Sequence, residues 1–340
     1  MVQGDENREL LVVLMDLTPV WWGTYAHENL ILPSFIECVL AFVNCHLTLS
    51  PLNEVAIIGV TPEQTEFLWP SSTPLEEFEL QPCHYGQYEA FAILGETVRR
   101  KVQRLVTSCE SLTCSVSFAS AINNALCYYI RRCRELRPTL SLQNDSAPSN
   151  AETVAVEDIS SLLTDNFHAR ILVVRAADDN SAQYLSLMNA VFTAQKLGVL
   201  IDACIIPPTR MAYSADDPLR QSSTTLQESS NSSLFQQAAD LTGGIYLRIP
   251  RPAGLMQYLL SVFLPRAGLR SQLILPDCGG GVGTGVDFRS ACFCHRKMVD
   301  LSYVCSVCLS IFCSFTPICS TCQTPFKIPI VAVLPPEKLK

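Results

Sequence analysis

The hydrophobic positions along this chain form short, continuous runs rich in β-branched residues, and longer segments of helical periodicity separate them. The runs are ELLVVLMD (9–16), EVAIIGV (54–60), TEFLWP (65–70), RILVVRA (170–176), VLIDACIIP (199–207) and GIYLRIP (244–250). A strand without polar alternation is typical of a sheet that is covered on both faces. These runs therefore predict a buried sheet.

Between the runs, apolar residues recur at helical spacing, for example at Val98, Val102 and Leu105. A helix with such a stripe buries one face and leaves the other to solvent. Two later segments, 181–198 and 234–244, each end in glycine before the next strand, which is a helix stop signal. Alternating strands and helices with short connections predict a doubly wound, mostly parallel α/β sheet.

Polar and glycine-rich stretches interrupt this pattern. Residues 137–165 and 207–233 are rich in Ser, Thr, Asn and Pro, which is typical of surface insertions. The sequence DCGGGVGTGVD (277–287) is typical of a flexible tether. We predict an α/β domain, a linker, a cysteine module and a tail at residues 1–276, 277–290, 291–326 and 327–340.

Composition narrows the class of protein. Of 340 residues, 48% are hydrophobic and 16% charged, which excludes a disordered chain. The net charge of -8 argues against a protein that binds nucleic acid mainly through positive charge, so we expect no direct sequence-specific nucleic-acid binding. The longest apolar runs, such as LLVVLM (10–15), are shorter than the roughly 18 residues of a membrane span. A soluble intracellular protein is expected, without a membrane partner.

Cysteines cluster near the end of the chain. Seven of the sixteen lie between Cys292 and Cys322. Two C-x2-C pairs are separated by ten residues, and each pair can present two thiolates to one ion from a tight turn. The predicted metal ligands are Cys305, Cys308, Cys319 and Cys322, with zinc as the ion.

A second ion is left open by the sequence. ACFCHR supplies Cys292, Cys294 and His295, and Cys313 lies between the two pairs. These donors lack two regular pairs, so a core role for Cys292 and Cys313 competes with a second zinc. Buried structural cysteines, disulfides or a redox C-x-x-C also compete for the regular quartet. A redox pair would have to open a helix beside a thioredoxin-like strand, and the segment is too short for that.

Several stretches together resemble one family. They are MDLTPVWWG (15–23), YLSLMNAVFTAQKLGVLIDAC (184–204), QQAADLTGGIYLRIP (236–250), LMQYLLSVFLP with RSQLILP (255–276) and ACFCHRKMVDLSYVCSVCLSIFCSFTPICSTC (291–322). The chain resembles the smaller von Willebrand A-type, zinc-module-bearing subunits of the core of general transcription factor TFIIH. The resemblance covers nearly the whole chain apart from the two polar insertions.

That resemblance implies a non-enzymatic scaffold in the nucleus. It implies a hetero-oligomer with other TFIIH subunits, chiefly the larger von Willebrand A-type subunit, in transcription initiation by RNA polymerase II and nucleotide excision repair. The alternatives are a RING-type ubiquitin ligase, which needs two well-formed zinc sites, and a cation-dependent ligand-binding von Willebrand A protein.

Adhesive von Willebrand A domains hold a cation with a D-x-S-x-S sequence after the first strand. Here Asp16 and Thr18 are present, but Val20 replaces the last hydroxyl, so the oxygen shell that Mg²⁺ prefers is incomplete. Asp178 and Asp179 could add oxygens, although Asp16 is better explained as a turn or capping residue.

Other candidate signals are weak. Trp21 and Trp22 either roof the local core or anchor a partner, since Trp is enriched at interface hot spots. The stretch GGGVGTG (279–285) fits no nucleotide-binding loop, and the five histidines have no catalytic spacing. The basic runs RRKVQR (99–104) and RRCRELR (131–137) fit solvated helix faces better than phosphate contacts. We therefore expect no catalytic residues.

Overall fold

The structure is a computed structural model, and it falls into two units. It describes residues 8–24, 26, 30–70, 88–111, 116–136, 167–176, 183–208, 233–274, 288–295 and 298–326. We call the first unit the α/β unit (residues 1–179 and 186–286) and the second the cysteine unit (residues 180–185 and 287–340). The insertion predicted at 137–165 lies outside the described residues, as do nearly all of the one at 207–233 and most of the linker.

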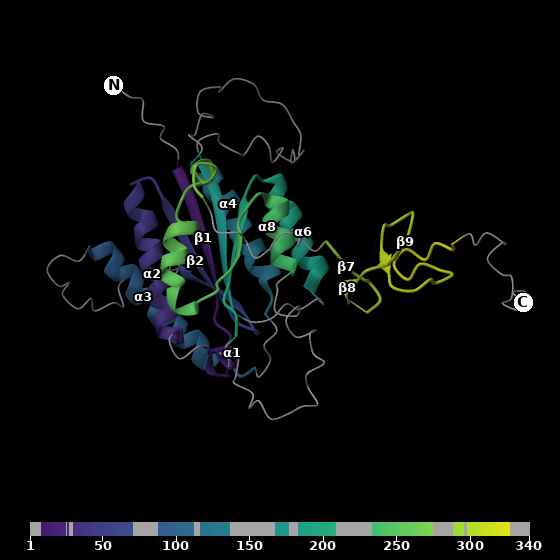
Figure 1. Ribbon diagram of the computed structural model, residues 1–340, viewed down its shortest axis with the longest axis horizontal. Helices are drawn as coiled ribbons and strands as arrows, with labels where there is room; N and C mark the ends of the chain where they lie inside the picture. The colour runs from purple at the N-terminus through teal and green to yellow at the C-terminus, as the bar shows by residue number, and fades with distance from the viewer. Residues whose placement is uncertain are drawn as a thin grey trace, which may run out of the picture. The chain divides into compact units, whose positions relative to one another are not determined.

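The α/β unit contains a six-stranded sheet with the order β3-β2-β1-β4-β5-β6 (Figure 1). The strands are β1 (Arg8–Asp16), β2 (Glu54–Val60), β3 (Thr65–Trp69), β4 (Phe167–Arg175), β5 (Leu200–Ile205) and β6 (Tyr246–Arg248). All neighbours are parallel except β2 and β3, which are antiparallel. The prediction of a mostly parallel α/β sheet is confirmed.

Strand β1 lies at the centre because its sequence tolerates burial on both faces. Its residues from Glu9 to Asp16 are all buried. Leu10 pairs with Glu54 of β2 on one side and with Ala169 of β4 on the other. The chain thus leaves β1 in one direction and returns beside it in the other, which is the doubly wound topology.

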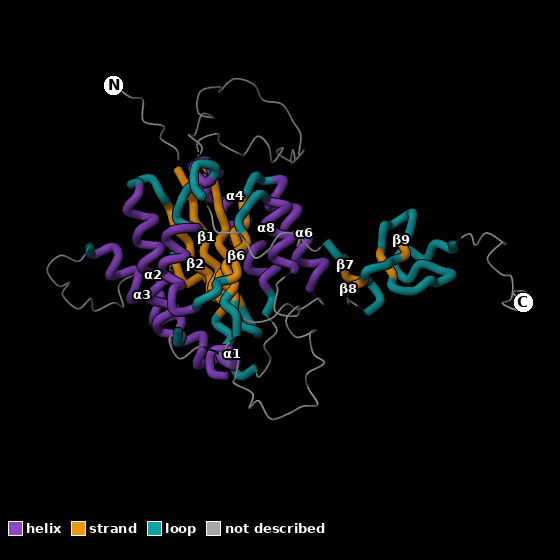
Figure 2. The backbone as a smooth tube through the Cα atoms, in the orientation of Figure 1, coloured by secondary structure: helices purple, strands orange, loops and turns teal. Residues whose placement is uncertain are grey.

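Helices cover both faces of the sheet (Figure 2). α2 packs with α3 and α9, whereas α8 packs on β5 and β6. The helical elements are α1 (Pro19–Thr24), α2 (Leu32–Leu49), α3 (Glu89–Ser108), α4 (Phe118–Leu136), α6 (Tyr184–Lys196), α8 (Ser233–Thr242), η5 (Pro252–Gly254), α9 (Leu255–Tyr258), the π-helical η6 (Leu259–Phe263) and α10 (Ala267–Arg270).

Helix α2 is long and apolar enough to cross a membrane by length and composition alone. Uninterrupted apolar runs do not reveal it, because Glu37, Asn44 and His46 break its pattern. Its buried residues include Phe35, Phe42 and His46, and the helix contacts β2, α3 and α9. This helix is therefore part of the core of the α/β unit.

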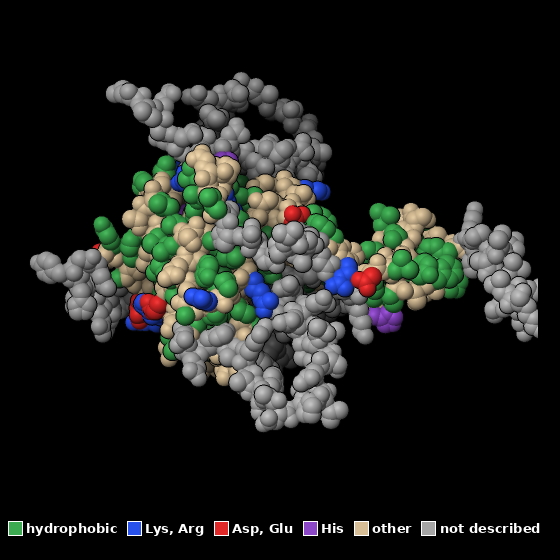
Figure 3. Space-filling view, in the orientation of Figure 1, with side chains coloured by type: hydrophobic (Ala, Val, Ile, Leu, Met, Phe, Trp, Pro, Cys, Tyr) green, Lys and Arg blue, Asp and Glu red, His purple; other side chains and the backbone are tan. Residues whose placement is uncertain are grey.

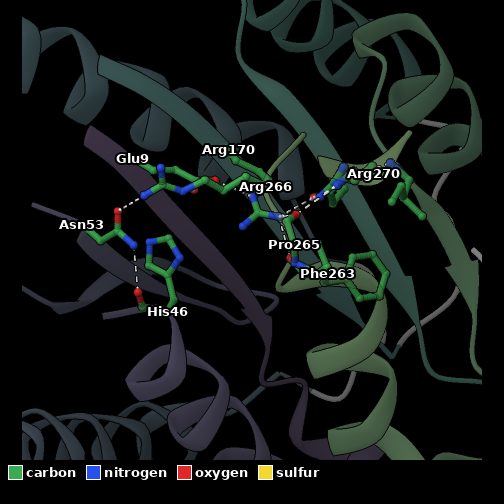
Figure 4. Close-up of polar contacts among 10 residues, drawn as sticks. Glu9, His46, Asn53, Arg170, Phe263, Pro265, Arg266 and Arg270 are labelled. Carbon is green, nitrogen blue, oxygen red and sulfur yellow. Dashed lines mark hydrogen bonds and ion pairs between the residues drawn. The ribbon is translucent and has the colours of Figure 1, made fainter. Parts of the chain in front are cut away.

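A network of buried charges fastens the segment after η6 to the sheet (Figure 4). Arg170 of β4 is only 2% exposed, and its guanidinium approaches Glu9 at 3.2 Å and Asp202 at 3.7 Å. Arg270 donates to both carboxylate oxygens of Asp202, and Arg266 pairs with Glu9 at 3.1 Å. Each buried charge has an opposite charge beside it, which offsets its loss of water.

The cysteine unit consists of two short antiparallel pairs and little regular structure. The first pair is β7 (Ser290–Ala291) with β8 (Met298–Val299), and the second is β9 (Tyr303–Val304) with β10 (Ile311–Phe312). Within the first pair, Ser290 pairs with Val299. The predicted domain boundaries stay predictions.

Candidate metal centre

The first C-x2-C pair forms a tight turn at the end of the β9–β10 hairpin. The backbone N–H of Leu309 donates to the carbonyl of Cys305 at 2.9 Å, and the N–H of Cys305 donates to the carbonyl of Ser310 at 3.0 Å. Leu309 has φ 59°, a left-handed conformation that is uncommon for a residue other than glycine. We call residues 305–310 the first knuckle.

The second pair repeats this geometry fourteen residues later, and we call residues 319–324 the second knuckle. Gln323 N–H donates to Cys319 at 2.9 Å, and Cys319 N–H donates to Thr324 at 3.0 Å. Gln323 has φ 58°. The bridge between Ile318 and Pro325 flanks this knuckle as the pairing of Val304 with Ile311 flanks the first. The two knuckles are therefore related by an approximate repeat.

The two knuckles bring four sulfurs together. The Sγ atoms of Cys305 and Cys322 are 3.7 Å apart, and those of Cys308 and Cys319 are 3.6 Å apart. All four ligand atoms lie within 4.8 Å of one another. A tetrahedral zinc site with Zn–S bonds of about 2.3 Å has edges of about 3.8 Å. The quartet can therefore hold a metal ion of that kind, and its separations are far longer than a disulfide bond.

One hydroxyl stands beside the second cysteine of each knuckle. The Ser310 hydroxyl lies 3.1 Å from the sulfur of Cys308, and the Thr324 hydroxyl lies 3.1 Å from that of Cys322. Hydrogen bonding by Ser310 lowers the pKa of Cys308 to about 6, and hydrogen bonding by Thr324 lowers the pKa of Cys322. Sequence reasoning missed both hydroxyls, although the spacing C-x2-C-x-[ST] occurs in both pairs.

The irregular second set also converges. Cys292, Cys294, His295 and Cys313 offer four ligand atoms within 4.8 Å of one another. The sulfur of Cys313 lies 3.4 Å from that of Cys294 and 3.2 Å from Nδ1 of His295. A soft thiolate and imidazole set suits zinc or a related transition metal. The structure thus shows a second group that can hold a metal.

The two sets alternate along the chain. Residues 292–295 belong to one set, 305–308 to the other, Cys313 to the first again, and 319–322 to the other. The hairpin β9–β10 makes this possible, because it turns the chain back so that the carbonyl of Ile311 accepts the N–H of Phe293 at 2.8 Å. Spacing alone left this set open, since Cys313 reaches its partners only through the fold.

The carboxylate of Asp16 is occupied by protein donors. Its Oδ1 accepts the hydroxyl of Thr18 at 2.5 Å and the N–H of Thr18 at 3.1 Å, while its Oδ2 accepts the N–H of Ala176 at 3.1 Å. Asp16 therefore caps the turn after β1 and ties it to the end of β4, as predicted. Asp178 and Asp179 lie outside the described residues.

Both tryptophans lie in the core of the α/β unit. Trp21 is 3% exposed and Trp22 is 8% exposed. The ring of Trp22 lies 4.8 Å from that of Phe35, and its indole N–H donates to the carbonyl of Asp16 at 2.9 Å. Of the two roles predicted, the structure favours roofing of the local core.

The two basic runs make ion pairs on helix surfaces. Arg99 of α3 pairs with Glu37 of α2 at 2.8 Å. Arg132 of α4 pairs with Glu54 of β2 at 2.8 Å. These contacts agree with the prediction of solvated helix faces rather than phosphate sites.

Comparison with known proteins places both units in one family. The family model Transcription factor Tfb4 matches residues 8–216 and 219–323. The general transcription and DNA repair factor IIH subunit tfb4 of Schizosaccharomyces pombe is 29% identical over 96% of this chain and 91% of the relative. The TFB4 subunit of Arabidopsis thaliana is 30% identical over 95% of this chain and 91% of the relative.

A solved structure agrees with the fold. The crystal structure of the TFIIH p34 N-terminal domain is 25% identical, with a TM-score of 0.54, and covers 75% of this chain and 98% of that one. The sequence match extends beyond that domain into the knuckles. Because the family model spans the sheet and both cysteine sets, this chain belongs to the Tfb4 transcription factor family.

Proposed function

We propose that this chain is a non-catalytic scaffold subunit of the TFIIH core complex in the nucleus. It acts in transcription initiation by RNA polymerase II and in nucleotide excision repair through contacts with other subunits. The observation that carries the proposal is the family match over both units, since the relatives are general transcription and DNA repair factor IIH subunits. The match does not support the alternatives of a ubiquitin ligase or a cation-dependent ligand-binding protein.

The resident ion is zinc, in two sites. The quartet of the two knuckles holds one ion, and the set Cys292, Cys294, His295 and Cys313 holds a second. Both donor sets support the assignment, because zinc binds Cys₄ and Cys₃His sets in tetrahedral geometry. Elemental analysis of the purified chain is expected to find two zinc ions per chain.

The donor count favours a structural role over a catalytic one. A catalytic zinc has about three protein ligands and keeps one position open for water or substrate. Each set here offers four protein donors, which fill a tetrahedral shell. In the α/β unit, both oxygens of Asp16 already accept hydrogen bonds from the protein. The role that fits is to hold a surface in shape.

The principal partner is the larger von Willebrand A-type subunit. Exposed apolar side chains gather on the cysteine unit (Figure 3). In the first knuckle, Val307 is 65% and Leu309 is 70% exposed, whereas the second knuckle has Thr321 and Gln323 at these positions. Geometry common to both knuckles does not require apolar residues there. Exposed apolar side chains of this kind are typical of a surface that another protein covers.

The matched positions of the two knuckles supply a test. Val307→Thr with Leu309→Gln gives the first knuckle the side chains of the second, so metal content should not change. Binding to the larger von Willebrand A-type subunit should weaken about tenfold or more if these residues are an anchor. The measurement is calorimetric titration with that purified subunit, and Thr321→Ala with Gln323→Ala is the control.

Two outcomes would contradict the proposal at different levels. An unchanged affinity would reject the first knuckle as a contact surface. Failure of the wild-type chain to co-purify with TFIIH subunits from nuclear extract would reject the scaffold function itself.

A further inference from the structure

We infer that Ser310 and Thr324 are positioning residues that hold the thiolates of Cys308 and Cys322 and slow the loss of the ion. The inference rests on the proposed metal site of the two knuckles. It assigns a role to two side chains that are not themselves ligands. The same arrangement occurs in both knuckles, whose sequences are CSVCLS (305–310) and CSTCQT (319–324).

The geometry is nearly identical in the two knuckles. In each, the residue two positions after the second cysteine brings its hydroxyl to 3.1 Å from that sulfur. The carbonyl of the same residue accepts the N–H of the first cysteine at 3.0 Å. One residue is thus joined to both cysteines of its pair, which fixes their relative position.

Burial makes the hydroxyl of Ser310 dependent on its sulfur. Ser310 is 1% exposed. A hydroxyl without a partner in such a place has an unfavourable free energy, so a thiolate acceptor is a stabilising partner for it. Thr324 is partly exposed and makes the same contact.

The two hydroxyls serve the ligands that water reaches more easily. Cys305 and Cys319, the first cysteines, are fully buried, whereas Cys308 and Cys322 are partly exposed. A partly exposed sulfur has fewer protein atoms packed around it, so its position is less restricted than that of a buried one. A hydroxyl that donates to this sulfur fixes its position and supplies a hydrogen bond to its negative charge.

Four thiolates around one divalent cation leave a net charge of about -2 in the site. Donors to sulfur spread this charge and orient the lone pairs that face the ion. Outer partners of this kind typically change metal affinity about 10- to 100-fold when they are removed. Loss of one hydroxyl should therefore speed release of the ion by about tenfold.

The test compares variants that remove only the hydroxyl. Ser310→Ala and Thr324→Val do so singly and together in the full-length chain. The controls Ser306→Ala and Ser320→Ala remove exposed hydroxyls from the same knuckles. Ser310→Thr and Thr324→Ser keep a hydroxyl and should restore the wild-type rate.

The first readout is the rate of zinc transfer to an excess of a chromophoric chelator. The phase from the knuckle site should quicken about tenfold in each single variant and further in the double variant. The phase from the other site should stay unchanged, as an internal control. With Co²⁺ in place of zinc, the sulfur-to-metal absorption band should move to lower energy, because a sulfur without its donor gives up electrons more readily.

The outcomes separate this inference from the proposed metal site. A double variant that releases zinc at the wild-type rate with an unshifted Co²⁺ band would overturn the inference, although the site would remain. Equal acceleration in the Ser306 and Ser320 variants would also overturn it. A wild-type chain that binds no metal would overturn the proposed site itself.

Discussion

His46 lies beside the buried charges that join the sheet to the segment after η6 (Figure 4). Its ring is fully buried, and this burial lowers its pKa to about 4, with the positive charges of Arg170 and Arg266 acting in the same direction. The backbone of Glu9 and Glu54 offsets only part of this effect. Between pH 4 and 6.5, the side chain of His46 is therefore neutral in the folded protein and charged in the unfolded chain.

This difference predicts an acid-sensitive stability. Between pH 6.5 and 4 the unfolded state binds a proton that the folded state does not, so the free energy of unfolding falls as the pH falls. The contribution of His46 to the free energy of unfolding is fully present above pH 6.5, and about 3 kcal/mol of it is lost by pH 4. Urea unfolding from pH 4.5 to 7.5 measures it. His46→Leu should make the free energy of unfolding depend less on pH, because it removes the imidazole. The hydrogen bond from Asn53 should remain, because it goes to the backbone carbonyl of His46.

His168 provides the matched control for this prediction. It lies on β4 of the same sheet but is exposed. His168→Gln should leave the pH dependence as in the wild type. A His46→Leu variant with the wild-type slope would show that another group causes the acid sensitivity.

At the scale of elements, glycines end α6 and α8 and allow the chain to turn back into the next strand. Gly198 after α6 and Gly243 after α8 have φ 66° and 74°, the left-handed conformation that ends a helix. The N–H of Val199 then bonds to Ala194, and the N–H of Gly244 bonds to Ala239. The stop signals in the sequence predicted both ends.

The two turns differ in the space around them, which leads to a prediction. A Cβ on Gly244 would lie 2.0 Å from the carbonyl oxygen of Ile201, whereas one on Gly198 would meet nothing within 4 Å. Gly244→Ala should lower the free energy of unfolding by about 3 kcal/mol or more, because β6 must move away from β5. Gly198→Ala should cost only about 1 kcal/mol of backbone strain. Urea unfolding of both variants tests this, and equal losses would contradict it.

At the scale of the whole molecule, the two units depend on different forces. The α/β unit has an extensive apolar core around β1 and β4. Among the described residues of the cysteine unit, Cys305, Phe312 and Cys319 form a buried cluster with a few partly buried residues around it, and Cys292 is also buried. A core of this size supplies little free energy, whereas a structural zinc supplies roughly 10 to 16 kcal/mol at neutral pH.

Removal of two ligands should therefore unfold one unit and leave the other. We predict that Cys305→Ser with Cys308→Ser makes the cysteine unit sensitive to protease while a fragment of the α/β unit persists. Limited proteolysis with mass spectrometry measures this, and Cys127→Ser, at an exposed cysteine of α4, is the control. Digestion of the whole chain at one rate would contradict the two-unit picture.

The sheet and the regular metal quartet could be predicted because their signals are local. Residues 10–15 of β1 and 171–174 of β4 are continuously apolar, which is typical of a doubly covered sheet. A C-x2-C pair likewise forms one turn by itself. The contact of Arg270 with Asp202 spans 68 residues and has no such local pattern.

By itself, the sequence determined the α/β class, the strands of the large sheet, the ends of α6 and α8 and the regular spacing of the cysteine quartet, because period, glycine and cysteine spacing act within a few residues. Only the tertiary structure decided that Cys313 joins Cys292, Cys294 and His295, that the two knuckles bring their four sulfurs together, and that His46 lies beside the buried Arg170. Each of these depends on how the chain turns back on itself. Distances between residues far apart in sequence are set by packing, which no short pattern encodes.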